Sequence, residues 1–108
     1  MVSNSYMRNN SGEYGGGLSL YDVTVVVISN NIFSGNSADH GGGVYVNTDK
    51  YIHGYSVLIA NTQFINNTAR YGGGCYVQFT KYCFVVNSSF MNNFAVKEGG
   101  VIRIFKTN

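Results

Sequence analysis

Residues 61–77 read NTQFINNTARYGGGCYV and contain the two motifs that decide the fold. The first motif is an N-x-x-F-x-x-N block that runs from Asn61 through Phe64 to Asn67. The second is the glycine cluster Gly72–Gly74, after which apolar residues recur at every second position. A period of two is typical of a strand with one buried face. This stretch therefore predicts short strands joined by turns, without a helix.

The same two motifs recur four times along the chain. The N-x-x-[F/M]-x-x-N block begins at Asn4, Asn30, Asn61 and Asn87, and the glycine clusters begin at Gly15, Gly41, Gly72 and Gly99. Those glycines are 26, 31 and 27 residues apart, and the last copy keeps the pattern with one extra residue between Asn93 and Gly99. Self-similarity at this period indicates a repeat architecture. The predicted units are approximately 1–17, 18–43, 44–74 and 75–100, with a final strand over 101–108, in a single β-solenoid domain spanning 1–108.

A unit of this length is too short for a propeller blade of about 40 residues and fits one coil of a parallel β-helix. We therefore expect an all-β, right-handed parallel β-helix (β-solenoid) of about four coils, with three short strands per coil. Equivalent strands of successive coils would lie about 4.8 Å apart. The right hand follows the usual rule for parallel crossovers. Differences in unit length are assigned to loops, of which Thr48–Tyr55 is the longest.

The repeated residues should stack as ladders through the coils. An apolar column is expected in the core: Met7, Phe33, Phe64 and Phe90. Two asparagine columns are expected at turns, where side-chain amides bond each other and loose backbone groups. They comprise Asn4, Asn30, Asn61 and Asn87, and Asn10, Asn36, Asn67 and Asn93. The glycine clusters would permit positive φ at a tight corner.

The F-x-x-N block followed by a glycine pair resembles the repeats of chlamydial polymorphic outer-membrane proteins. FSGN over 33–36 and FINN over 64–67 carry the resemblance, which extends over nearly the whole chain. The second motif of that family is G-G-A followed by an aliphatic residue, and here it reads GGGL, GGGV, GGGC and GGVI. The resemblance implies a right-handed β-helix and a surface or adhesin role.

Composition excludes several classes of function. Charged residues make up 11% of the chain and its formal net charge is +2, so no basic patch favours nucleic acid. No apolar run approaches the roughly 18 residues of a transmembrane segment. Asp39 and His40 are neighbours in a predicted turn, which we interpret as solvated rather than catalytic. The glycine clusters lack the phosphate-loop motifs. We expect no enzyme, no metal and no cofactor.

Cysteines and sequons offer candidate covalent sites. Cys75 and Cys83 fall on inward positions of one predicted coil, where a disulfide and two small buried thiols both fit. Sequons of the form N-x-[S/T] occur at Asn9, Asn66 and Asn87. Asn9 and Asn66 are expected to point outward and are the candidate glycosylation sites. Asn87 is expected to turn into its corner.

Two outward surfaces are candidate binding faces. The strand after each glycine cluster presents Tyr45 and Tyr76, an aromatic stripe that fits either a stacked surface ladder or a ligand such as a sugar ring. The strand before each leading asparagine is apolar on both faces, which indicates burial or an interaction site. Its outward residues predict a lateral interface: Val25, Val27, Leu58, Phe84 and Val86.

The ends of the repeat array suggest the function. Natural solenoids carry polar caps over their open ends, and the sequence contains no capping segment. Asn108 followed by Met1 of another copy would continue the repeat at close to its internal spacing. We expect a structural subunit of an extracellular filament or surface coat, whose partners are further copies of itself or neighbouring coils of a longer solenoid. The alternative is an adhesin-type module from a longer surface protein, which binds a glycan or surface ligand through the tyrosine stripe or Thr48–Tyr55.

Overall fold

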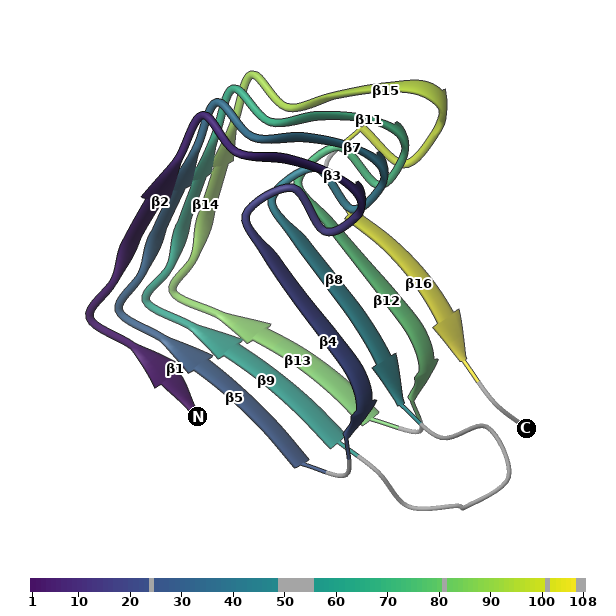
Figure 1. Cartoon of the computed structure of the whole chain (residues 1–108). Coiled ribbons are helices and arrows are strands. Elements are labelled where there is room, and N and C mark those ends of the chain that lie inside the picture. Colours follow the sequence, from purple (N-terminus) through teal and green to yellow (C-terminus); the bar gives the residue numbers. More distant parts are fainter. Residues whose placement is uncertain (24, 49–55, 81, 101, 107–108) are drawn as a thin grey trace.

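A computed structural model describes residues 1–23, 25–48, 56–80, 82–100 and 102–106. These residues form an all-β parallel solenoid of about four coils, in which each strand pairs with its equivalent four strands later (Figure 1). The predicted fold class is therefore confirmed. Residues 49–55, which make up most of the predicted long loop, lie outside the described residues.

Each coil contributes four strands. The first coil contains β1 (Val2–Ser3), β2 (Tyr6–Arg8), β3 (Ser11–Tyr14) and β4 (Leu18–Val23). The second contains β5 (Val25–Ser29), β6 (Ile32–Ser34), β7 (Ser37–His40) and β8 (Val44–Thr48). The third contains β9 (Ser56–Ala60), β10 (Gln63–Ile65), β11 (Thr68–Tyr71) and β12 (Cys75–Thr80). The fourth contains β13 (Tyr82–Val86), β14 (Ser89–Met91), β15 (Phe94–Glu98) and β16 (Ile102–Lys106).

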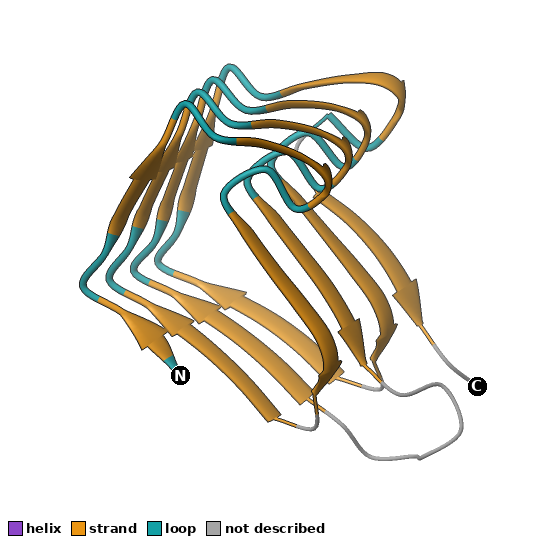
Figure 2. Cartoon of the chain, viewed as in Figure 1, coloured by secondary structure: helices purple, strands orange, loops and turns teal. Residues whose placement is uncertain are grey.

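Equivalent strands form four parallel sheets that surround one core (Figure 2). Sheet A contains β1, β5, β9 and β13, and sheet B contains β2, β6, β10 and β14. Sheet C contains β3, β7, β11 and β15, and sheet D contains β4, β8, β12 and β16. Sheet C is the difference from prediction, because only three strands per coil were expected. The extra residue expected between Asn93 and Gly99 lies in β15, because the register shifts between the pairs Ala69–Ala95 and Tyr71–Glu98.

Alternate residues of β5, β8, β9 and β12 point into the core, as the alternation predicts. Val26 and Ile28 of β5, and Val44 and Val46 of β8, are almost fully buried. Phe33 and Phe64 complete this core from sheet B, each with no exposed surface. Partly buried Met7 and Phe90 pack against it in the two outer coils. The core is therefore a continuous rod of stacked side chains that is best covered in the middle coils.

The glycine corners between sheets C and D depend on the missing side chain. Gly41 has a φ of 69°, in the left-handed region that glycine adopts freely. A Cβ on Gly42 would lie 2.2 Å from the carbonyl oxygen of Gly73 in the next coil. The coils therefore approach too closely at this corner for any other residue, which explains why the cluster recurs.

Candidate functional site

The asparagine ladder at the corner between sheets B and C joins all four coils. Asn36 and Asn67 are buried, and their Oδ1 atoms accept the backbone N–H of Asn10 and of Asn36, each at 3.0 Å. Asn93 Oδ1 accepts the Asn67 N–H, also at 3.0 Å. The Nδ2 atoms donate back to carbonyl oxygens one coil earlier, for example from Asn67 to Phe33 at 3.0 Å. Each buried amide thus satisfies backbone groups of the preceding coil.

This ladder has a direction. A main-chain N–H always donates to the amide oxygen of the following coil, and an Nδ2 donates to a carbonyl of the preceding coil. By the same pattern, the outer edge of the fourth coil presents the Asn93 N–H and the Phe90 carbonyl. The outer edge of the first coil presents Asn10 Oδ1. The two open ends of the described solenoid are therefore complementary rather than alike.

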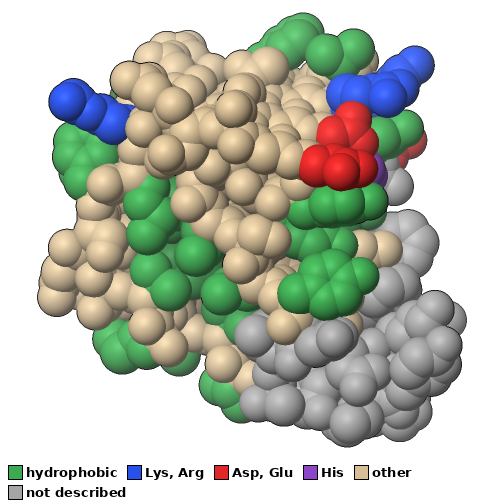
Figure 3. Space-filling model, viewed as in Figure 1, with side chains coloured by type: hydrophobic (Ala, Val, Ile, Leu, Met, Phe, Trp, Pro, Cys, Tyr) green, Lys and Arg blue, Asp and Glu red, His purple; other side chains and the backbone are tan. Residues whose placement is uncertain are grey.

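The phenylalanine column has the same continuity. Phe64 pairs in register with Phe33 on one side and Phe90 on the other, and Phe33 pairs with Met7. The rings of Phe33 and Phe64 are stacked with centroids 5.3 Å apart, and those of Phe64 and Phe90 with centroids 4.6 Å apart. In the outer coils this column is only partly covered, and hydrophobic side chains reach the surface on the face viewed in Figure 3.

The leading asparagines act differently from the prediction. Asn4, Asn30, Asn61 and Asn87 are exposed, and their φ angles lie between 47° and 60°. The expected amide ladder at this position is therefore wrong, as is the inward orientation of Asn87. Asparagine tolerates the left-handed region better than other non-glycine residues, so the backbone conformation explains why asparagine occupies this position.

A polar column at that corner, buried in the two middle coils and partly buried in the outer coils, lies one residue later. It comprises Ser5, Asn31, Thr62 and Ser88. Asn31 Oδ1 accepts the Ser5 N–H at 2.9 Å, and Ser88 Oγ accepts the Thr62 N–H at 3.2 Å. The signal in the sequence is a polar residue directly after every leading asparagine. A search for one repeated residue type overlooks it, because the position is occupied by Ser, Asn, Thr and Ser in successive coils.

The outer face of sheet A is apolar across the coils. Val27, Leu58 and Phe84 pair in register, as do Val25, Ser56 and Tyr82. Val25 is 65% exposed, Phe84 57% and Val86 46%, while Val27 and Leu58 are half-buried. The structure thus places all five predicted lateral residues on the outside, while their neighbours Val26, Ile28, Val57 and Ile59 face the core.

Tyr45 and Tyr76 on the outer face of sheet D are covered, contrary to the exposed stripe that was considered. Tyr45 is 2% exposed and Tyr76 6%. A second aromatic column at the ends of the sheet C strands packs beside them: Tyr14, His40 and Tyr71, with His40 stacked between the two tyrosines. These residues directly precede the glycine clusters, and that shared position is the sequence signal for them. Because their ring faces contact each other, they offer little platform for a sugar.

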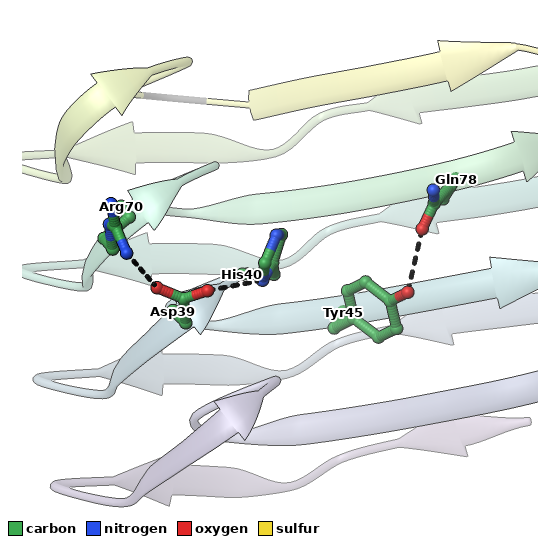
Figure 4. A network of polar contacts seen from close by, with 5 residues as sticks. All are labelled: Asp39, His40, Tyr45, Arg70 and Gln78. Atoms are coloured by element: carbon green, nitrogen blue, oxygen red, sulfur yellow. Dashed lines mark hydrogen bonds and ion pairs between the residues drawn. The ribbon is translucent and has the colours of Figure 1, made fainter.

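Polar contacts fix this outer aromatic cluster (Figure 4). Tyr45 donates its hydroxyl to Gln78 Oε1 at 2.9 Å and accepts Asn47 Nδ2 at 3.0 Å. Burial raises the pKa of Tyr45 to about 12, against a smaller opposing effect of the Asn47 bond. Asp39 lies 2.9 Å from His40 Nδ1 and 3.6 Å from Arg70 on the next coil. The described residues contain no group of three metal-ligating side chains.

The candidate covalent sites are resolved in part. Cys75 and Cys83 are free thiols, so the disulfide alternative is wrong. Both thiols belong to the core, where Cys75 is buried and Cys83 is partly buried against the same cluster. Burial raises the pKa of the Cys75 thiol well above its usual value. Asn9 and Asn66 are exposed at left-handed corners with φ of 57° and 55°, so both sequons are accessible.

Comparison with known proteins identifies the repeat. Residues 32–47 and 61–78 match the family model of the Chlamydia polymorphic membrane protein (Chlamydia_PMP) repeat. No curated protein and no solved structure shows significant similarity to the chain. The described residues contain no helix long and apolar enough to cross a membrane. The repeat family points to a surface or outer-membrane protein. Two segments of the chain are therefore similar to Chlamydia polymorphic membrane protein repeats, and the structure places them in successive coils of a parallel β-solenoid.

Proposed function

We propose that the chain is a structural β-solenoid subunit of an extracellular filament or surface coat, which assembles end to end. The observation that carries this proposal is the direction of the asparagine ladder. One open end offers donors where the other offers acceptors, so the ends of two copies would pair as internal coils do. Such a contact is heterologous, and a heterologous contact that does not close into a ring grows into a filament.

The energetics of the open edges support the same role. Strand edges with unpaired N–H and C=O groups favour pairing with another chain. Phe90 adds partly exposed apolar surface beside its edge, on the side opposite Phe64. A neighbouring coil that covers this edge would bury Phe90 and extend all four sheets at once. Lateral contacts through the outer face of sheet A would then join such rods into a coat.

The proposal is tested by light scattering and negative-stain microscopy of the chain over a range of concentrations. We expect rods that lengthen with concentration. Phe90→Glu should prevent elongation, because it places a carboxylate in the apolar column at the open end. Phe94→Glu is the matched control, since Phe94 lies on the same coil, is 61% exposed and faces outward. A soluble monomer at high concentration overturns the filament.

An adhesin-type binding module is the alternative, and the surface-protein family of the repeats supports it. In either role the proposed function is non-catalytic and uses no cofactor. Residues 49–55, one of the two ligand positions considered, lie outside the described part of the chain. Binding of the monomeric chain to a glycan array or to cells, together with failure to assemble, would favour the adhesin.

A further inference from the structure

Sheet C carries a column of charged residues on its outer face. The column occupies the position just before the Tyr14–His40–Tyr71 column, and successive coils place there Glu13, Asp39, Arg70 and the bulge Val96–Lys97. Glu13 and Lys97 are exposed, and the Arg70 side chain is 57% exposed. Acidic and basic side chains gather together over this part of the molecule in Figure 3. The column is thus acidic in the first two coils and basic in the last two.

Neighbouring coils are close enough for charges in this column to interact. Arg70 Nη1 and Asp39 Oδ1 lie 3.6 Å apart although 31 residues separate them in the chain. The same register joins β3 to β7, whereas the extra residue in β15 places both Val96 and Lys97 opposite Arg70. A coil stacked beyond the fourth would therefore bring its own residue at this position within reach of Lys97.

We propose that Lys97 of one copy pairs with Glu13 of the next copy, and that this pair selects the head-to-tail orientation of the filament. The inference rests on the end-to-end assembly proposed above. Head-to-tail stacking continues the column with a basic residue beside an acidic one. Stacking of two first coils would bring only the acidic Glu13 of this column to the junction, and stacking of two fourth coils would bring only the basic Lys97. Like charges at one junction disfavour those arrangements.

Two further charged residues near the junction, Glu98 and Arg8, occupy other positions in the stack. Glu98 lies in the adjacent column, where its register partner is Tyr71, so a following copy would place Tyr14 beside it. Arg8 belongs to sheet B and contacts the Tyr6 ring, with 5.6 Å from its guanidinium carbon to the ring centroid. An exposed ion pair adds little affinity, so its main effect is on orientation, association rate and salt dependence.

Charge reversal provides the test. Lys97→Glu alone opposes two carboxylates at every junction, and Glu13→Lys alone opposes two lysines. We expect each variant to raise the concentration needed for filament growth roughly tenfold at low salt. An equimolar mixture of the two variants restores a complementary pair at every junction and should assemble as the unmodified chain does. Rescue on mixing cannot come from a misfolded variant. Arg8→Glu is the control, since it reverses an exposed charge outside the column.

The outcomes separate the two proposals. If each variant assembles normally alone, or if mixing gives no rescue, the Lys97–Glu13 pair is wrong while end-to-end assembly stands. If the unmodified chain does not assemble at any salt concentration between about 0.05 and 0.5 M, both proposals fail.

Discussion

At the scale of single residues, Phe64 shows how much one side chain contributes to the stability of the fold. It has no exposed surface and its ring is stacked between Phe33 and Phe90. We expect Phe64→Ala to lower the free energy of unfolding by about 3–5 kcal/mol, because it leaves a cavity at the centre of the core. Denaturant titration measures this loss. Phe94→Ala removes an exposed ring of the same type and should cost no more than about 0.5 kcal/mol.

Asparagine has two separate roles in this chain, and substitutions should distinguish them. Asn30 is exposed with a φ of 60°, so Asn30→Gly should be almost neutral and Asn30→Ala should cost about 1 kcal/mol. Asn67 is buried and bonds Asn36, Phe33 and Asn93, so Asn67→Ala should cost about 3 kcal/mol or more. Thermal unfolding of the three variants compares them. If Asn30→Gly were as unstable as Asn67→Ala, the side chain at the leading position would contribute to stability, as the predicted amide ladder requires.

Tyr45 should make stability fall at alkaline pH. Its folded pKa is raised to about 12 by burial, above the value near 10 in an unfolded chain. A raised pKa means that the folded state keeps the proton longer, so its contribution is complete below pH 10 and is lost as the pH rises through about 12. Unfolding midpoints measured across this range should fall less steeply for Tyr45→Phe. Parallel curves for the two chains would contradict the assignment.

At the scale of elements, sequence alternation predicts sheets A and D but not sheet C. Buried strand faces are predicted by the alternation of Val26 with Ile28 and of Val44 with Val46. The N-x-x-F block predicts the strands of sheet B. The first three strands of sheet C read SGEY, SADH and TARY, and their inward residues are Gly12, Ala38 and Ala69. Such small inward residues carry no hydrophobic signal. These strands form because their neighbours in the stack supply the hydrogen bonds.

Parts of the candidate site also escape prediction from one sequence. The outward orientation of Tyr45 follows from alternation, but its burial depends on Tyr14 and Tyr21, which come from another coil. Periodicity therefore identifies the face of a residue and not whether a neighbouring element covers that face. The charged column of sheet C is equally invisible until register aligns residues that lie far apart in the chain.

The outer face of sheet A provides an element-scale test of lateral association. Leu58 lies at its centre, half-buried between Val27 and Phe84 in the paired strands. We expect Leu58→Lys to leave the fold intact and to abolish side-by-side association, because charge would enter an apolar contact. Sedimentation and electron microscopy would show single rods. Ser34→Lys on sheet B is the control, and lateral bundles that persist in Leu58→Lys would exclude this face.

At the scale of the whole molecule, the parallel register means that every coil offers the same backbone N–H groups to the coil that follows it. The N–H groups of Asn61, Asn66 and Gly72 donate to the fourth coil at Val86, Met91 and Glu98. The equivalent N–H groups one coil later belong to Asn87, Asn92 and Gly99, and they point to the open edge. The same atoms are therefore protected within the stack and available at its end.

Amide hydrogen exchange can follow these atoms as the chain assembles. In dilute solution, exchange should be slow at Asn61, Asn66 and Gly72, because opening them requires separation of two coils. It should be fast at Asn87, Asn92 and Gly99. At concentrations where rods form, the second group should become protected, because a neighbouring copy supplies the missing acceptors. Assembly that leaves these three amides unprotected would have to proceed through the lateral face alone.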